Sequence, residues 1–582
     1  MKCRFLLPLR VASLALAASF ATAAHAQWSS DAANNLVVGD AAGGTTQPKI
    51  VAAPDGGFYV SWFGNGADGY DIRLQRLDAG GHELWAHDGV LVADRGYSFT
   101  YDYGLAVDTA GNAYVSFNCC TNNSTDEHIV VSKVLADGSL AWGAAGLTVS
   151  APASTEAVYN AYVTGTSDGD VVVAWSADGG VRAQKLDPAG TALWAANGVL
   201  LNQPSGFKLL GGVQPGLGGD AIASWSNQSG STRILRAQKL ASADGAALWG
   251  SGTAVRVFGA GNLQAGYYPP FIADGAGGGV FWDYDAIGLV QNARVQHLDA
   301  SGNLLLGANG VLATTDTANS HLGTVASWDA ASGSIYVVWN DYLNSGGSDY
   351  DGVSAQRIDS SGARTWGDAG KVLVPLTDST DGTHVISQLT ALPTPDGVLA
   401  GWVTGAIPAA DQPLTVARLD AAGDYVWAAQ TTAVKTQRYT GRMTGTIGSD
   451  GFAVYAWQDG GNGDDATIRA QNLNLDGTLG TPVATYTIGG SVSGLVGNGL
   501  VLQLDGANDL PVSADGGFTF AAPLADGSAY TVSVLAQPGN PAQTCSIANG
   551  SGTLAGANVT NVEVNCVTDA NDVIFADGFD GA

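Results

Sequence analysis

The stretch VRAQKLDPAGTALWAANGVLL, residues 181–201, holds an aspartate, a glycine and a tryptophan at a spacing that decides the fold. The same pattern returns about every 55 residues along the chain. Its eight visible copies begin at residues 72, 130, 181, 235, 293, 353, 414 and 468. Internal repeats of this length indicate that one supersecondary unit is used many times.

Each copy contains a four-residue turn that ends in glycine. The eight glycines are Gly81, Gly138, Gly190, Gly245, Gly302, Gly362, Gly423 and Gly477. The first turn position is aspartate in five copies, and Leu135, Ser242 or Asn474 in the others. A type I turn favours Asp, Asn or Ser at its first position and Gly at its fourth. A catalytic carboxylate would not be replaced from copy to copy, so the aspartate is predicted to be a turn residue.

Two series of large apolar residues accompany the turns. Four residues after the glycine come Trp85, Trp142, Trp194, Trp249, Leu306, Trp366 and Trp427. The second series closes short apolar runs such as FYVSW and consists of Trp62, Phe117, Trp175, Trp225, Trp282, Trp339, Trp402 and Trp457. Such runs are typical of buried strands. Regular recurrence of large aromatic residues favours a core position over a sugar-binding one.

Each unit is therefore predicted to form four β-strands. Repeats of four strands indicate an all-β fold, a β-propeller of eight four-stranded blades over residues 27–484, with seven blades as the alternative. Residues 28–38 resemble the fourth strand of a unit, and the eighth copy lacks that strand. We expect the N-terminal strand to complete the last blade and close the ring, which removes free sheet edges.

The repeat stops near residue 484, and residues 485–568 alternate apolar and polar positions between short turns. This pattern predicts a small β-sandwich. Cys545 and Cys566 lie on its last strands and are expected to form a disulfide, which stabilises such a loop by about 3 kcal/mol. Cys119 and Cys120 are adjacent, too close for an ordinary disulfide. They form either a vicinal disulfide or two free thiols.

The N-terminus predicts export. Residues 1–26 combine Lys2 and Arg4 with an apolar run and a final AHA, the layout of a secretory signal peptide. No later run has the roughly 20 apolar residues of a spanning helix, so no membrane span is predicted. The expected location is extracellular or on the outer surface, with the periplasm as the alternative.

The charge of the predicted mature chain excludes nucleic acid as a partner. Loss of the signal leaves 21 of the 24 basic residues against 52 acidic ones, a net charge of −31. Such a surface repels nucleic acid and anionic lipid. Metal cations, cationic partners and neutral glycans remain compatible.

The acidic residues gather in the connections between the second and third strands. Residues 63–71, 118–128, 283–290, 340–352 and 458–467 hold twelve carboxylates and no Lys or Arg. Equivalent propeller loops project from one face, so they form one acidic rim. The candidate ligand or metal residues are Asp68, Asp71, Asp283, Asp285, Asp341, Asp349, Asp351, Asp459, Asp464 and Asp465. Such loops suit Ca²⁺, which takes about six to eight oxygen ligands, although none has EF-hand spacing. The alternative is ordinary solvated loops.

Another recurring pair precedes the turn. Arg73, Arg182, Arg236, Arg294 and Arg469 each stand two residues before a glutamine. We expect these Arg and Gln side chains to pair between blades. The histidines outside the signal fall in unrelated repeat slots, and the sequence contains no HExxH, Walker loop or GxSxG motif. No catalytic residue is predicted.

The AQRLD..G..LW units resemble the repeats of bacterial secreted β-propeller proteins. Residues 485–567 resemble Ig-like or carboxypeptidase-regulatory-like modules, and the tail DVIFADGFDGA is similar to the short tails of exported Gram-negative proteins. Residues 569–582 are therefore a candidate sorting signal. The turn also resembles the Asp-box of sialidases, but its Ser-x-Asp opening is missing. The resemblance implies an architecture and supplies no catalytic residues.

The sequence thus predicts an exported, non-enzymatic binding or structural module. Its expected ligand, a glycan or a protein at the cell surface, lies on the acidic rim. The alternative is a polysaccharide-acting hydrolase or lyase with its site in the propeller channel. Such an enzyme would carry carboxylates or histidines that break the repeat at strand ends facing the channel.

Overall fold

The computed structural model describes residues 27–96, 100–119, 127–150, 156–259, 261–263, 269–287, 290–406, 411–449, 451–461, 465–481 and 485–569. The chain divides into two compact units, Met1–Thr481 and Pro482–Ala582. The described residues are almost entirely β-strand and turn, with two short 3₁₀ segments, Leu217–Gly219 and Gly250–Gly252. No helix among them is long and apolar enough to cross a membrane. The predicted signal peptide and residues 570–582 lie outside the described part.

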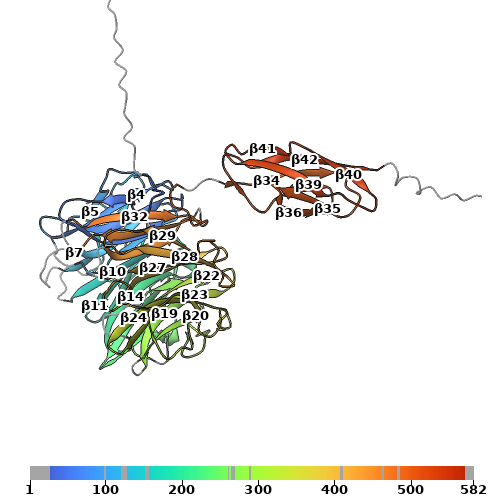
Figure 1. Ribbon diagram of the computed structural model, residues 1–582. Coiled ribbons are helices and arrows are strands. Elements are labelled where there is room, and N and C mark those ends of the chain that lie inside the picture. The colour runs from blue at the N-terminus through green and yellow to red at the C-terminus, as the bar shows by residue number, and fades with distance from the viewer. Residues whose placement is uncertain are drawn as a thin grey trace, which may run out of the picture. The chain divides into compact units, whose positions relative to one another are not determined.

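The first unit contains eight four-stranded antiparallel sheets among its described residues (Figure 1). Seven of them, sheets 1 to 7, use four consecutive strands each. Sheets 1 to 3 contain β2 (Thr45–Ala52), β3 (Phe58–Asn65), β4 (Tyr70–Leu77) and β5 (Val90–Ala93); β6 (Gly104–Val107), β7 (Ala113–Cys119), β8 (His128–Val134) and β9 (Leu147–Thr148); and β10 (Val158–Gly165), β11 (Val171–Ala177), β12 (Gly180–Leu186) and β13 (Val199–Leu201).

Sheets 4 to 7 repeat this order of strands. They contain β14 (Phe207–Pro215), β15 (Ala221–Ser229), β16 (Thr232–Leu240) and β17 (Val255–Arg256); β18 (Phe271–Ala273), β19 (Gly279–Ile287), β20 (Val290–Leu298) and β21 (Val311–Leu312); β22 (Ser320–Asp329), β23 (Ser334–Ser345), β24 (Ser348–Ile358) and β25 (Lys371–Asp378); and β26 (Ile386–Thr394), β27 (Gly397–Thr404), β28 (Leu414–Asp420) and β29 (Thr431–Lys435).

Sheet 8 combines both ends of the unit. β30 (Thr440–Ile447), β31 (Ala453–Asp459) and β32 (Thr467–Leu473) are joined by the N-terminal β1 (Leu36–Gly39), in the order β1-β32-β31-β30. Leu36 lies opposite Ala470 in an antiparallel ladder. The predicted addition of the N-terminal strand to the eighth unit is therefore observed. In Figure 1 the orange β32 lies beside the blue strands of sheet 1, on which it packs.

The core lies between the sheets. A separate cluster of buried apolar residues joins each sheet to the next in the chain. A further cluster, with Trp28, Trp62 and Phe452, joins sheet 8 to sheet 1. The second aromatic series is buried throughout, with exposures of 0% to 5%. Its predicted core position is confirmed.

The repeated turn has the predicted geometry. In sheet 3 the Gly190 amide donates to the Asp187 carbonyl at 2.9 Å, and the Thr191 amide donates to Asp187 Oδ1 at 2.7 Å. Gly190 has a φ of 92°, and a Cβ there would lie 3.1 Å from the Trp142 ring. The same Cβ would lie still closer to Leu147 Cδ1, so glycine is favoured both by its backbone conformation and by two side chains of the preceding sheet.

The tryptophans of the first series connect neighbouring sheets. Trp194 Nε1 donates to the carbonyl of Ser242, in the turn of the next sheet, at 2.9 Å. Trp28 supplies the same contact from the N-terminus, donating to the Ala79 carbonyl at 2.8 Å.

In the fourth turn the Gly245 amide donates to the Ala241 carbonyl rather than to that of Ser242, because that turn is one residue longer. The prediction that Ser242 opens this turn is wrong.

The recurring Arg and Gln side chains donate to backbone carbonyls of their own sheet. The prediction that they form contacts between blades is therefore wrong. Gln184 Nε2 donates to the Ala195 carbonyl at 2.9 Å, and Arg182 Nη1 donates to Asn197 at 3.4 Å. These carbonyls belong to the segment that leads into the fourth strand and lack ladder partners. In sheet 8 the N-terminal segment takes this place, since Gln471 donates to Ser29 at 2.6 Å.

The Lys or Arg near the end of the third strand, one residue after the glutamine position, makes the contact between sheets instead. Lys185 Nζ donates to the Gly219 carbonyl at 3.0 Å and to Ser242 Oγ at 2.6 Å, both in sheet 4 or its turns. Arg418 Nη1 donates likewise to Leu475 at 2.7 Å. The side chain reaches one sheet further than the glutamine because it lies on the opposite face of the strand.

The second unit contains two four-stranded sheets and a two-stranded one among its described residues. The four-stranded sheets have the orders β37-β34-β42-β40 and β36-β35-β39-β41, and β33 pairs with β38. The strands are β33 (Thr485–Tyr486), β34 (Ile488–Ser493), β35 (Leu500–Leu504), β36 (Ala507–Val512), β37 (Gly516–Thr519), β38 (Leu524–Ala525), β39 (Ala529–Ala536), β40 (Gln543–Ala548), β41 (Ser551–Thr553) and β42 (Val559–Thr568).

The cysteines fall in both units. Cys545 on β40 and Cys566 on β42 lie directly opposite each other and form a disulfide, as predicted. Cys119, the last residue of β7, is disulfide-bonded. Cys120, its predicted vicinal partner, lies outside the described residues.

Candidate functional site

The sheets of the first unit have two distinct ends. β10 begins at Val158, opposite Ala177 and the turn between the second and third strands. It ends at Gly165, opposite Val171 and beside the repeated turns. We call the former the hairpin end and the latter the repeat-turn end. The predicted acidic rim belongs to the hairpin end.

Two of the predicted rim loops are extended hairpins. Residues 340–352 continue β23 to Ser345 and β24 from Ser348, and residues 283–290 continue β19 and β20. Gly346 and Gly347 have φ values of 64° and 89°, as a two-residue hairpin turn requires. The loop prediction is wrong there, because the ladder between β23 and β24 continues to the pair Ser345–Ser348. Tyr342 OH adds a side-chain bond to Asp349 Oδ1 at 2.6 Å.

The three carboxylates of this hairpin are occupied by protein groups. Asp341 Oδ1 accepts from Trp339 Nε1 at 2.7 Å and lies 2.9 Å from His321 Nδ1. Asp351 accepts from Asn340 at 2.8 Å and from Ser379 at 2.7 Å. The bonds to Asp349 from Tyr342 and Asn344 lower the pKa of Asp349.

Asp459 is the centre of a buried ion cluster. Its carboxylate lies 3.0 Å from Arg469 Nε, 3.3 Å from Arg438 Nε and 3.4 Å from Lys435 Nζ. Burial lowers the pKa of Lys435 to about 8. The rim segments contain no Lys or Arg, but β29, β32 and the connection between β29 and β30 supply the cations.

The remaining candidates are scattered. Burial raises the pKa of Asp71, whose Oδ1 accepts from the Arg95 amide at 3.3 Å. Asp283 is buried opposite Arg294 on β20. Asp68 is exposed, and Asp465 Oδ2 lies 3.7 Å from Arg438. The Asp285 side chain and all of Asp464 lie outside the described part.

The predicted carboxylates that the structure describes do not converge on one point. Within the described residues, a group of three metal-ligating side chains forms only at Asp40, His87 and Asp88, whose ligand atoms lie within 4.8 Å of one another. None of these was among the predicted residues. Calcium binding by the acidic rim stays a prediction.

A different set of side chains gathers on the first strands of the sheets, near their hairpin ends. These strands shift register between Thr46 and Lys49 in β2, between Tyr159 and Ala161 in β10 and between Thr440 and Met443 in β30. A β-bulge re-aims the side chains beside it. Here the residues at or beside the shift differ from sheet to sheet.

Asp102, just before β6, connects three consecutive sheets. Lys49 Nζ lies 2.8 Å from Asp102 Oδ1, and Tyr162 OH donates to Oδ2 at 2.7 Å. Burial raises the pKa of Asp102, but Lys49, Tyr162 and the Tyr103 amide outweigh it and hold the pKa below its ordinary value. The Asp102 side chain is still 40% exposed, and that of Lys49 is 27% exposed. A ligand can therefore reach both charged groups.

A polar cavity of about 510 Å³ lies beside this cluster. Thr45 and Thr46 of β2, Arg442 of β30 and Thr100 line it, together with Tyr70 and other residues of the hairpin end. Arg442 is its one charged residue among those described. The cavity thus spans the first strands of sheets 8 and 1 and the segment that leads into sheet 2.

An aromatic row continues from the cavity. Tyr101, the neighbour of Thr100, has its ring centroid 6.0 Å from that of Tyr159, which lies 6.5 Å from that of Phe207. Tyr101 is 38% exposed and Phe207 is 47% exposed. Three aromatic side chains from consecutive sheets therefore share one partly open surface. We call Lys49, Tyr101, Asp102, Tyr159, Tyr162, Phe207 and Arg442 the first-strand site.

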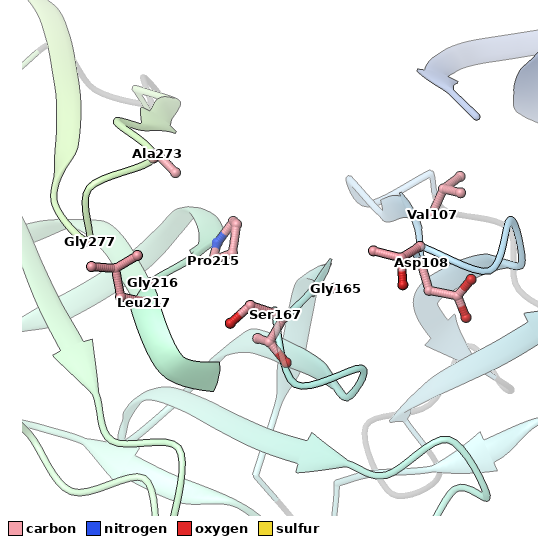
Figure 2. A pocket seen from close by; sticks show the side chains of 12 residues that line it. Val107, Asp108, Gly165, Ser167, Pro215, Gly216, Leu217, Ala273 and Gly277 are labelled. Atoms are coloured by element: carbon pink, nitrogen blue, oxygen red, sulfur yellow. The ribbon is translucent and has the colours of Figure 1, made fainter. Parts of the chain in front are cut away.

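A second cavity, of about 330 Å³, lies at the repeat-turn end (Figure 2). Val107, Pro215 and Leu217 surround it, with several glycines of the turns. Its carboxylate, Asp108, already accepts from the Asn112 amide at 2.8 Å and from Tyr114 OH at 3.1 Å. This cavity offers fewer polar groups to orient a ligand than the first-strand site does.

The sequence did not reveal the first-strand site. Its members share no regular spacing along the sequence, since Lys49, Asp102 and Tyr162 come from three different repeats. The signal that the sequence does offer is a break in the repeat, because equivalent positions of the first strands hold unrelated residues.

No protein-family model and no curated protein sequence matches the chain. Solved structures similar to it include the Dos1 propeller, with 14% identity and a TM-score of 0.40, over 75% of this chain and 95% of that chain. An ulvan lyase of a new polysaccharide lyase family has 12% identity and a TM-score of 0.42, over 77% and 96%. An α-L-arabinanase of Penicillium chrysogenum has 12% identity and a TM-score of 0.32, over 76% and 99%. At these values the likeness carries no argument about activity.

Proposed function

We propose that the first unit is an eight-bladed propeller whose hairpin end binds a polysaccharide. Eight sheets in sequence-order contact, with an apolar cluster between the last and the first, support a ring. Trp28 occupies the place of the repeat tryptophan and donates to the turn of sheet 1. The N-terminal segment therefore acts as the fourth strand that closes the ring.

The observation that carries the polysaccharide assignment is the exposed aromatic row beside a polar cavity. The C–H faces of sugar rings pack on aromatic rings, while their hydroxyl groups need hydrogen-bond partners. Tyr101, Tyr159 and Phe207 offer the rings, and the cavity around Arg442 offers polar groups. The site is an open surface that crosses several sheets, which suits a chain molecule better than a small one.

Export of the protein belongs to the same proposal. The predicted signal peptide and the disulfide between Cys545 and Cys566 fit an oxidising compartment. In this proposal the second unit is an Ig-like module, and residues 569–582 are a sorting signal. Deletion of residues 569–582 tests the latter, because a sorting signal is required for the final location of the protein.

Titration with a panel of soluble polysaccharides tests the binding site. Tyr159→Ala and Phe207→Ala should each weaken binding about tenfold, or roughly 1.4 kcal/mol, because each removes a ring from the row. Leu217→Ala is the matched control, since Leu217 is an exposed apolar residue at the repeat-turn end. Equal affinity for all four proteins would reject the aromatic row as the binding surface.

The second candidate function is cleavage of the bound polysaccharide. The Lys49–Asp102–Tyr162 cluster favours it, because a carboxylate, an amine and a phenol in contact are groups that transfer protons in catalysis. Product analysis would detect new reducing ends after hydrolysis, or the ultraviolet absorbance of a new double bond after elimination. Asp102→Asn should abolish either product. Binding without any product would favour the non-enzymatic module.

A further inference from the structure

Arg442 differs from every other arginine in the described part of the chain. Each of the others has a hydrogen-bond or charged partner, as Arg182 does with Glu156 at 3.0 Å and Arg418 with Asp396 at 2.6 Å. The Arg442 side chain is exposed and makes no ion pair or hydrogen bond with any described residue. Its guanidinium therefore keeps its five N–H donors available to a ligand.

Other donors line the same cavity. The Asn65 side chain and the Tyr70 hydroxyl, both at the hairpin end of sheet 1, make no hydrogen bond within the described residues. The Thr46 hydroxyl donates to Gln458 Oε1 at 2.7 Å, so these two lining groups already have a partner in the protein. The cavity thus offers one positive charge and several uncommitted polar groups.

We propose that Arg442 binds an anionic group on the polysaccharide that occupies the hairpin end. This inference rests on the proposed function and adds the substrate class to it. A carboxylate or a sulfate presents two oxygens to the guanidinium fork, and such paired contacts are stronger than bonds between neutral groups. The sugar ring that carries the anion lies in the cavity, and the adjoining rings follow the aromatic row from Tyr101.

Because the protein is strongly acidic, Arg442 is needed for an anionic polymer to bind tightly. The chain carries a formal charge of −28, so an anionic polymer is repelled at long range. At about 0.15 M salt this repulsion is screened beyond roughly 8 Å, whereas a direct contact in a cavity is screened much less. Without Arg442, a charged polymer should bind more weakly than its neutral counterpart.

Two matched pairs of polymers test the inference at constant ionic strength. Polygalacturonate is compared with its methyl ester, and dextran sulfate with dextran, so that each pair differs in the anionic group. The proteins are the wild type, Arg442→Gln, Arg442→Lys and Arg256→Gln. The last variant removes the same charge from the exposed Arg256 on the outer strand β17. Circular dichroism checks that each variant is folded.

We expect the wild type to bind at least one anionic polymer roughly tenfold more tightly than its neutral partner. Arg442→Gln should remove that preference and leave the anionic polymer bound more weakly than its neutral partner. Arg442→Lys should keep part of the preference, and Arg256→Gln should not change it. Preference within the polygalacturonate pair identifies a carboxylate, and preference within the dextran pair identifies a sulfate.

Equal binding within both pairs, or a preference that survives Arg442→Gln, would overturn the inference. The proposed function would still stand if the neutral polymers bind and Tyr159→Ala weakens them. No binding of any of the four polymers by the wild type would count against both.

Discussion

The two ends of the first unit use their side chains differently. At the repeat-turn end, a residue such as Lys185 or Asp187 contacts the next sheet or its own turn, and equivalent residues repeat the contact around the unit. At the hairpin end, Lys49, Asp102 and Arg442 have no counterpart in the other sheets. Recurring residues hold the sheets together, whereas a ligand site must differ from one sheet to the next.

Replacement of a scaffold residue should therefore cost stability. Trp28→Ala removes a buried ring whose centroid lies 6.4 Å from that of Phe58 and whose Nε1 donates to the Ala79 carbonyl. We expect the free energy of unfolding to fall by about 3–5 kcal/mol, the usual range for loss of a buried aromatic side chain. Denaturant titration measures it. An unchanged unfolding curve would contradict the proposed closing role of the N-terminal segment.

The repeated glycine offers a narrower test of the same end. Gly81 and Gly111 both have positive φ, 83° and 82°. A Cβ at Gly81 would lie 2.6 Å from the Trp28 ring, whereas a Cβ at Gly111 would meet nothing within 4 Å. Gly111→Ala should cost about 1–2 kcal/mol for its backbone conformation, and Gly81→Ala about 1–3 kcal/mol more for the clash.

Denaturant unfolding of the two glycine variants gives both values. Equal losses would mean that the backbone conformation alone requires glycine and that the contact with tryptophan does not matter.

The smallest expected effect concerns a buried residue of the hairpin end. Burial lowers the pKa of His321, but Asp341 and the Asp316 carbonyl outweigh it, so the pKa lies above its ordinary value of 6.5. The folded state therefore binds the proton more tightly, and the resulting stability is full below pH 6.5. It should be lost as the pH rises through the raised pKa.

Unfolding free energies of the wild type and His321→Gln across this pH range measure that effect, with an NMR titration of His321 to locate the pKa. A difference between the two proteins that does not depend on pH would mean that His321 is neutral throughout. The ring would then act through its packing on Trp339 and its contacts with Asp341 and the Asp316 carbonyl, and not through a charge.

The parts of the fold that depend on local spacing could be predicted from the sequence. The turn from Asp187 to Gly190 and the buried Trp175 follow from turn chemistry and alternation, and each recurs often enough to exclude chance. The strand at Leu36–Gly39 could be predicted because it fills a gap that the eighth copy leaves.

Contacts between distant segments could not be predicted. The hairpin of residues 340–352 consists of residues with low strand preference, and cross-strand bonds decide its structure. Asp459 meets Lys435, Arg438 and Arg469 from three separate segments. The first-strand site likewise joins residues from several sheets, and no regular spacing along the chain predicts it.

The central claim is that the ligand binds at the hairpin end. Hydrogen exchange of the full chain, with and without a polysaccharide that it binds, tests this most directly. The account predicts slower exchange at residues 43–49, 100–104, 158–162, 207–210 and 440–443. Slower exchange confined to residues 107–111, 165–170 and 215–220, at the repeat-turn end, would contradict it.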